Sequence, residues 1–329
     1  MLLFRTRINT SSRANESLSN LVLNCEILNH VLEGKKITIE DAKEIFNISK
    51  HNPTELFNTA KILRNNNKKN IVTFSKKAFF NVVNLCRDIC SYCTYKAEPG
   101  ESKLSMMNKD DVLQLAQIAK KYRCVEALFV TGERPEERYD DARKWLKNNG
   151  FSSTAEYLLY CSEIALENGL FPHTNAGNLT KDEMKELRKT NPSMGLMLEN
   201  SSERLSEKNM PHHFAPSKKP EARLHVLENA GELGIPMTTG ILVGIGETGN
   251  EIIESIFAIK KIHEIFGNIQ EVILQNFQPK DDTIMSDFPP VDENYFKRIV
   301  ALTRVIMPDM NIQIPPNLSP MSYQSFLSV

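Results

Sequence analysis

Three cysteines fall within the eight residues Cys86-Arg-Asp-Ile-Cys90-Ser-Tyr-Cys93, directly after an apolar run that is typical of a strand. A loop of this length can fold its three sulfurs around one inorganic centre. Zinc in a structural site normally takes four protein ligands, often as two separated pairs. Three thiolates on a four-iron cluster leave one iron open for another ligand. The spacing therefore favours a [4Fe–4S] cluster, and a zinc site and unligated thiols are the alternatives.

Outward from this loop, short apolar runs alternate with longer amphipathic stretches. The expected strands are Phe79–Leu85, Val125–Thr131, Leu170–Asn175, Met194–Glu199, Met237–Val243, Glu271–Phe277 and Asn311–Ile314. The expected helices cover about 108–122, 153–168, 180–189, 220–233, 248–266, 292–306 and 319–327. This alternation predicts parallel strands with crossover helices. A doubly wound sheet is possible. A TIM-type (βα) barrel of about seven units fits better, because polar residues end most strands and those ends meet at one mouth.

The chain divides into two expected regions. Residues 1–70 are predicted to be an N-terminal helical extension, in which Asn65–Asn70 is a polar connector, and residues 71–329 the barrel core. The stretch from Asn200 to Pro220 is rich in His, Pro and Lys, and we expect it to be an insertion at the mouth. The chain ends soon after the seventh expected strand, so we expect the eighth strand of a complete barrel to be lacking.

The composition of the 329-residue chain excludes several classes of protein. Hydrophobic residues make up 41% and charged residues 25%, as in ordinary globular chains. Lys+Arg 40 against Asp+Glu 41 shows no electrostatic footprint for nucleic acid. No apolar run is long enough to span a membrane, and the N-terminus lacks a signal-peptide core. We therefore expect a cytoplasmic protein, in which the six cysteines serve a metal or chemistry rather than disulfides. Cys25, Cys124 and Cys161 are predicted to be buried apolar thiols.

The C-x₃-C-x₂-C loop after the first expected strand resembles the radical S-adenosylmethionine (radical SAM) superfamily. In that family the open iron is chelated by S-adenosylmethionine, and one electron from the cluster cleaves the sulfonium to give a 5′-deoxyadenosyl radical. The resemblance implies that Cys86, Cys90 and Cys93 ligate a [4Fe–4S] cluster and that S-adenosylmethionine is the second cofactor. It also implies that Tyr92 lies near the adenine, although packing in the core is an alternative role for this ring.

The ends of the next strands carry further candidate contacts. Thr131-Gly132-Glu133 resembles the family's Gly-Gly-Glu element, which holds the amino group of the cofactor, with Thr131 replacing the first glycine. On its own this string indicates only a strand-to-loop turn. Asn175 ends the third strand and is favoured over His173 as a ligand contact, although a capped turn is an equally good interpretation.

The fourth expected strand ends in Glu199, a carboxylate that is costly to bury unless it is paired. Arg204 or Arg223 is the expected partner. Related radical SAM barrels use a Glu at this strand end and an Arg on the next helix to position the ribose and carboxylate of the cofactor. The resemblance therefore implies cofactor contacts for Glu199 and Arg223.

Gly244-Ile-Gly246 precedes a helix and could be interpreted as a phosphate-binding loop. It lacks the third glycine of a dinucleotide fingerprint, so this interpretation is weak. The loop instead resembles the radical SAM segment that runs beside the adenine and ribose.

A narrower resemblance covers about residues 72–320 and is to the CofG-type subunit of 7,8-didemethyl-8-hydroxy-5-deazariboflavin synthase. It is carried by Asn84-Leu-Cys-Arg-Asp88-Ile-Cys, Pro172-His-Thr-Asn175, Met197-Leu-Glu199, Thr238-Thr-Gly-Ile-Leu-Val-Gly-Ile-Gly-Glu-Thr248, Gln275-Asn-Phe-Gln-Pro-Lys280 and Ile314-Pro-Pro-Asn-Leu318. The resemblance implies a radical SAM lyase in deazaflavin coenzyme biosynthesis. Its substrate would be the tyrosine-derived hydroxybenzyl adduct of 5-amino-6-(D-ribitylamino)uracil, cyclised with loss of ammonia. A CofH-type subunit or activity would supply that adduct, and a low-potential electron donor would reduce the cluster.

Other functions remain open from the sequence. The rivals are the CofH-type sister subunit, a menaquinone-pathway radical SAM enzyme and a non-catalytic metal-binding barrel. The reaction needs a proton acceptor, for which His212 and His213 in the insertion are candidates only, so no catalytic side chain is assigned. Family members continue beyond this sequence with a Gly/Asp-rich segment, and we expect its absence to affect substrate binding more than cofactor cleavage.

Overall fold

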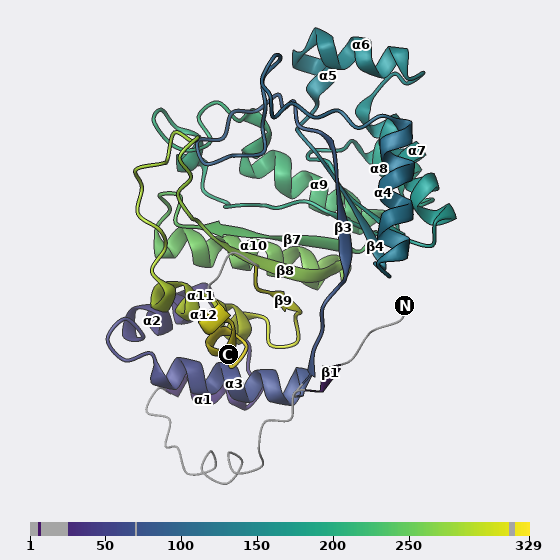
Figure 1. Cartoon of the computed structure of the whole chain (residues 1–329). Helices are drawn as coiled ribbons and strands as arrows, with labels where there is room; N and C mark the ends of the chain where they lie inside the picture. The colour runs from purple at the N-terminus through teal and green to yellow at the C-terminus, as the bar shows by residue number, and fades with distance from the viewer. Residues whose placement is uncertain (1–5, 8–25, 70, 316–319) are drawn as a thin grey trace.

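A seven-stranded parallel sheet forms the centre of the computed structural model, which describes residues 6–7, 26–69, 71–315 and 320–329 (Figure 1). Its strands are β3 (Lys77–Val83), β4 (Glu126–Thr131), β5 (Phe171–Asn175), β6 (Ser193–Gly195), β7 (Met237–Val243), β8 (Ile269–Asn276) and β9 (Ile312–Gln313). Each strand pairs in parallel with the next one along the chain. The strand order has no reversal, so the predicted barrel-type architecture is confirmed and a doubly wound sheet is excluded.

Helices connect these strands at the expected places. They are α4 (Lys109–Lys121), α7 (Thr154–Glu167), α8 (Lys181–Leu187), α9 (Pro220–Glu232), α10 (Gly249–Phe266), α11 (Glu293–Ile306) and α12 (Pro320–Phe326). Two short helices that were not predicted, α5 (Pro135–Arg138) and α6 (Asp140–Asn148), follow β4 and lie at the top of the view in Figure 1. Capping boxes begin α4, α8 and α10, because a Thr or Asn and an acidic residue three positions later satisfy each other's backbone amides.

The barrel core is explained by the burial of its strands. All seven residues of β7 are buried, as a strand with both faces covered requires, whereas the residues of β4 are alternately buried and half-buried. Phe80 and Phe129 are fully buried on the neighbouring strands β3 and β4, with ring centroids 4.9 Å apart. One apolar cluster fills the space between the sheet and its helices.

The fourth strand is shorter than predicted. The expected run Met194–Glu199 is a regular strand only as far as Gly195. Beyond it the chain stays hydrogen-bonded to β7, and Glu199 donates its N–H to the Gly240 carbonyl at 3.0 Å. Glu199 itself has a φ of 64°, a left-handed conformation that a strand cannot continue through.

Three helices precede the barrel: α1 (Glu26–Leu32), α2 (Ile39–Ile48) and α3 (Thr54–Lys68). Of these, α2 packs against α10 and α11, α3 packs against α11, and α1 packs on α2 and α3. The three helices lie beside α11 and α12 in Figure 1 and share one apolar core with the barrel. Arg298 of α11 donates to the Ser49 hydroxyl at 3.0 Å. Upstream, β1 (Thr6–Arg7) pairs antiparallel with β2 (Ile71–Val72). The division of the chain at residue 70 stays a prediction.

The predicted connector at Asn65–Asn70 is wrong over its first four residues, because α3 continues to Lys68. Asn70 lies outside the described residues. Asn67 donates its side-chain amide to the Leu63 carbonyl at 2.9 Å, so the polar side chains decorate the helix. Lys69 ends it with a φ of 55°. Packing of the buried face of α3 outweighs the weak helix propensity of asparagine.

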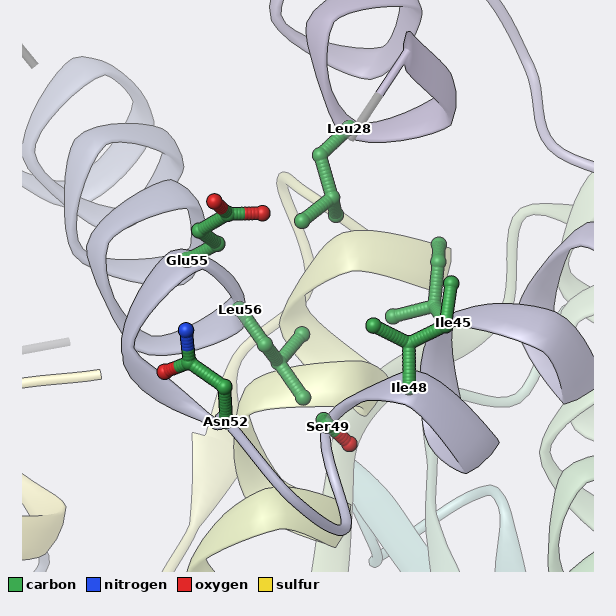
Figure 2. Close-up of a pocket in the computed structure, with 7 residues that line it drawn as sticks. All are labelled: Leu28, Ile45, Ile48, Ser49, Asn52, Glu55 and Leu56. Carbon is green, nitrogen blue, oxygen red and sulfur yellow. The ribbon is translucent and has the colours of Figure 1, made fainter. Parts of the chain in front are cut away.

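A small cavity lies between α1, α2 and α3. Its volume is about 10 Å³, which leaves room for one water molecule at most. Figure 2 shows its lining, formed by Leu28, Ile45, Ile48, Ser49, Asn52, Glu55 and Leu56. It is a packing gap far too small for an organic ligand. In the described part of the chain, none of the helices combines the length and apolar character that crossing a membrane requires.

Candidate functional site

The segments after several strands meet at one mouth. The loop after β3 donates the Arg87 N–H to the Glu133 carbonyl, which follows β4, at 2.7 Å. The same loop donates the Ile89 N–H to the Phe214 carbonyl of the insertion after β6, at 2.9 Å. The cysteine loop therefore lies where the carboxyl ends of the parallel strands converge, which is where barrels carry their chemistry.

All three cysteines of this loop are free thiols and half-buried. Burial raises the pKa of Cys86 to about 11 and that of Cys90 to about 12. Both thiols therefore stay protonated at neutral pH unless a metal displaces the proton. The Cys93 sulfur adds to the rise of both pKa values by charge repulsion, so the three sulfurs share one neighbourhood.

The remaining cysteines are separate from this loop. Cys161 is buried within α7, as predicted, and its burial raises the thiol pKa to about 12. Cys124 is half-buried rather than buried, because it follows α4 at the rim of the sheet. Cys25 lies outside the described residues.

Gly132 allows β4 and the cysteine loop to touch. It donates its N–H to the Val83 carbonyl at 2.7 Å, and the N–H of Glu133 donates to Cys86 Sγ at 3.1 Å. A Cβ on Gly132 would collide with the carbonyl group of Leu85 and lie 2.8 Å from Cys86 Cα. Only glycine fits here, and the N–H of the next residue, Glu133, donates a hydrogen bond to the candidate ligand Cys86.

Glu133 is a buried carboxylate with several partners. It accepts the Asn178 N–H at 3.0 and 3.1 Å and lies 3.7 Å from Nη2 of Arg223. Arg223 also donates Nε to the Ser217 carbonyl at 2.8 Å. Burial raises the pKa of Glu133, while Arg223 and the Asn178 amide oppose that rise. Gly177, with a φ of 74°, leaves room for this carboxylate, because a side chain there would overlap it.

The predicted contacts on β4 and β5 lie at or near the ends of these strands. Thr131 is buried, and its hydroxyl has no hydrogen-bond partner among the described residues. Asn175 ends β5 and is half-buried, and no hydrogen bond of its amide is recorded in the described residues. His173 instead bonds within the sheet, with Nδ1 2.8 Å from the Ser193 hydroxyl. Burial lowers the His173 pKa to about 4.

The expected arginine partners of Glu199 are wrong. Its carboxylate accepts a hydrogen bond from Lys218 Nζ at 2.5 Å, and its second oxygen, Oε2, is buried with no partner among the described residues. Arg204 pairs with Glu251 at 2.6 Å, and Arg223 faces Glu133. The reason is that the insertion turns back through a short 3₁₀ helix, Pro216–Lys218, which brings a lysine to this strand end.

The loop after β7 binds its own carboxylate. Glu247 accepts the N–H groups of Gly244 at 2.7 Å and Ile245 at 2.8 Å. These two amides are therefore occupied by the carboxylate of Glu247, which argues against the phosphate-loop interpretation. Gly244 and Gly246 have φ values of 97° and 108°, which favour glycine.

The insertion holds the cysteine loop through a segment that we call the strap, Pro211–Lys218. The Ser91 N–H donates to the Pro211 carbonyl at 3.0 Å, and the Ser217 N–H donates to Asp88 Oδ1 at 3.4 Å. Asp88 is buried, and its Oδ2 has no partner among the described residues. Sequence reasoning placed the insertion at the mouth but had no signal for these contacts or for Asp88.

Tyr92 lies between the strap and an apolar wall. Its hydroxyl is 2.9 Å from Nε2 of His212, a buried histidine of the strap. Burial lowers the pKa of His212 to about 4, so its ring is neutral at physiological pH. His213, the other candidate proton acceptor, is exposed and packs on Phe214. The Tyr92 ring packs against an apolar cluster of Leu205, Leu242, Ile245, Phe277 and Met285.

Comparisons with known proteins agree with this site. A family model described as the radical SAM superfamily matches residues 80–259. The 7,8-didemethyl-8-hydroxy-5-deazariboflavin synthase of Methanopyrus kandleri is 46% identical over 250 residues, covering 76% of this chain and 75% of that protein. The FO synthase of Nocardia farcinica is 46% identical over 254 residues, which cover 75% of this chain and 29% of that protein.

Solved structures support the fold alone. The FeFe-hydrogenase maturase HydG from Carboxydothermus hydrogenoformans matches 95% of this chain and 68% of its own, with a TM-score of 0.75 and 20% identity. Radical SAM enzymes use a [4Fe–4S] cluster together with S-adenosylmethionine, as the three-cysteine loop indicated. The chain belongs to the radical SAM superfamily and, within it, to the family of the 7,8-didemethyl-8-hydroxy-5-deazariboflavin synthases.

Proposed function

We propose that this chain is the CofG-type component of 7,8-didemethyl-8-hydroxy-5-deazariboflavin synthase. It cyclises the hydroxybenzyl adduct of 5-amino-6-(D-ribitylamino)uracil to the deazaflavin with loss of ammonia. The observation that carries the proposal is the three-cysteine loop at the strand ends, in a chain 46% identical to a synthase of that name over 250 residues.

The donor set fits the two cofactors. Cys86, Cys90 and Cys93 are free, and they follow β3 at the mouth. In the described part of the chain, no three His, Cys, Asp or Glu side chains gather closely enough for a single metal ion. A four-iron cluster takes each thiolate on a different iron, so its ligands need not meet at one point as zinc ligands must. Three thiolates therefore suit a four-iron cluster better than a structural zinc site, which takes four protein ligands.

Buried polar atoms without partners in the described residues support a binding site for S-adenosylmethionine here. The hydroxyl of Thr131 and Oε2 of Glu199 are buried without partners in the described residues, a state that a polar ligand would relieve. Glu133 would hold the amino group of the cofactor. Arg223, whose Nη2 lies 3.7 Å from the Glu133 carboxylate, would hold the carboxylate of the cofactor. Tyr92, Asn175 and the Gly244–Gly246 loop would line the remainder of the pocket.

When bound, the cluster and S-adenosylmethionine supply a one-electron cleavage that produces a 5′-deoxyadenosyl radical. The chain's own residues then have to position the substrate and keep water away, since no side chain need act as a nucleophile. The apolar wall of Leu242, Ile245 and Phe277 can exclude water beside Tyr92. His212 is bonded to Tyr92, so the proton acceptor is still unassigned.

A second activity is needed to make the adduct. The chain spans 29% of the Nocardia farcinica FO synthase, which leaves most of that protein without a counterpart here. We propose that a CofH-type subunit supplies the adduct and that a low-potential electron donor reduces the cluster. A cytoplasmic location, in which the thiols stay reduced, belongs to the same proposal.

Anaerobic reconstitution followed by assay tests this function. The protein is loaded with iron and sulfide, reduced, and given S-adenosylmethionine with the purified adduct, and both products are measured by chromatography. We expect deazaflavin and 5′-deoxyadenosine in the wild type, neither in Cys90→Ala, and both in the matched control Cys161→Ala. Cofactor cleavage without deazaflavin would favour a CofH-type or menaquinone-pathway reaction. Cluster binding without any cleavage would favour a non-catalytic metal-binding barrel.

A further inference from the structure

The strap contacts the cysteine loop at several points. One of these contacts, among the described residues, joins two aromatic side chains, those of His212 and Tyr92. His212 and Tyr92 are 120 residues apart in sequence, and their rings meet edge to face with centroids 5.6 Å apart. The Tyr92 hydroxyl lies 2.9 Å from Nε2 of His212. This pair therefore connects the wall of the cofactor pocket directly to the insertion.

The backbone of His212 is hydrogen-bonded on both sides. Its backbone N–H donates to the Leu205 carbonyl at 2.9 Å, and its carbonyl accepts the Ala215 N–H at 2.9 Å. The residue is 3% exposed. A buried imidazole on a backbone bonded in this way can restrain the group that bonds to it.

Tyr92 needs such a partner. Its ring packs against apolar side chains, including Leu242 and Phe277, and a phenol hydroxyl beside such a wall is costly without a hydrogen bond. His212 is the one partner recorded for this hydroxyl within the described residues. Without it, the hydroxyl would have to turn toward water and take the ring with it.

We propose that His212 is a positioning residue. The hydrogen bond between its Nε2 and the Tyr92 hydroxyl holds this ring in the S-adenosylmethionine pocket and the strap on the cysteine loop. The inference rests on the proposed function, because it assumes that the pocket beside Tyr92 takes the cofactor. It assigns His212 no proton transfer with substrate, since its Nε2 is occupied by the tyrosine.

The test measures S-adenosylmethionine binding to the reconstituted holoenzyme by equilibrium dialysis. We expect His212→Phe, which keeps a ring but no acceptor, to weaken binding by about three- to tenfold, as one lost hydrogen bond does. Tyr92→Phe should weaken it equally, and the double variant no further, because both changes remove the same contact. His212→Gln, whose amide oxygen can accept, should recover part of the affinity. His213→Gln is the matched control and should bind the cofactor like the wild type.

Hydrogen exchange supplies a second measurement on the same holoenzymes. The amides of Ile89 and Ser91 are bonded to the strap, so the peptide covering 86–93 should exchange faster in His212→Phe than in His213→Gln. If His212→Phe does not fold, the binding and exchange of Tyr92→Phe provide the test, since this variant removes a single oxygen atom. Wild-type affinity and exchange in Tyr92→Phe, or additive losses in the double variant, would overturn the inference. A wild type that holds a cluster but binds no S-adenosylmethionine would instead overturn the proposed function, and this inference with it.

Discussion

Replacing Gly132 by alanine should damage the junction between β4 and the cysteine loop. The new Cβ would lie 2.6 Å from the Leu85 carbonyl carbon, nearer still to its oxygen, and 2.8 Å from Cys86 Cα, whereas real Cβ contacts essentially never fall under 3.0 Å. All three atoms belong to backbone, so no side chain can rotate away. The loop itself has to move by several tenths of an ångström or more.

The cost follows from what crosses this junction. Inserting a methyl group into a packed site costs about 1–3 kcal/mol, and each weakened hydrogen bond adds about 0.5–1.5 kcal/mol. The bonds at risk are Gly132 N–H to Val83 O, at 2.7 Å, and Glu133 N–H to Cys86 Sγ, at 3.1 Å. We expect a loss of about 2–6 kcal/mol, which lowers the melting temperature of a chain of this length by roughly 3–9 °C.

The assay combines thermal unfolding followed by circular dichroism with iron analysis after reconstitution. Gly132→Ala should unfold earlier and bind less iron than the wild type. Gly150→Ala is the control, since its φ of 87° costs about 1–2 kcal/mol but a Cβ there meets nothing within 4 Å. It should keep the full iron content. A Gly132→Ala protein with wild-type iron and a melting temperature within about 2 °C of the wild type would refute the steric argument.

Three further outcomes are expected. Arg204 lowers the pKa of Glu251 from 4.5 to about 2, so the stability from this pair is complete above pH 4.5 and is lost as the pH falls toward 2. In urea unfolding, Glu251→Gln should be less stable than the wild type by about 1–2 kcal/mol at pH 6 and by less at pH 3. The same difference at both pH values would contradict this. Lys218→Met removes the partner of the buried Glu199 carboxylate and should lower the free energy of unfolding in urea by about 3–5 kcal/mol. Lys218→Arg, which keeps the positive charge, is the control. A loss under about 1 kcal/mol in Lys218→Met would show that the pair does not stabilise the fold. Cys161→Ala should cost about 1 kcal/mol in thermal unfolding yet leave the iron content unchanged, and a loss of iron would link that thiol to the cluster.

The parts of the fold that sequence reasoning predicted have local causes. The strand at Met237–Val243 was predicted to the residue, because a short run of β-branched and apolar residues bounded by turns is typical of a strand. The start of α10 follows from Thr248 and Glu251, which form a capping box visible in the sequence. The cysteine loop was found from spacing alone.

The parts that sequence reasoning missed depend on residues far apart in the chain. Glu199 was expected to pair with an arginine, but the turn of the insertion brings Lys218 to it instead. The contact between Tyr92 and His212 joins residues 120 positions apart, and neither residue carries a local mark of the other. Charge and polarity indicated that these side chains need partners, whereas the choice of partner is made only by the folded chain.

The strap also sets an order of events during biosynthesis. The ribosome delivers Cys86, Cys90 and Cys93 early, but two of the carbonyls that hold their loop belong to Pro211 and Phe214, which are translated much later. A nascent chain that ends before the strap can bond this loop through Glu133 but lacks the contacts to Pro211 and Phe214, and domains complete their packing only after such late segments emerge. Before that point the cysteine loop is incompletely folded, so its thiols are exposed to zinc binding or oxidation when iron is delivered. Maturation of the metal centre is therefore a step that has to follow translation of the strap.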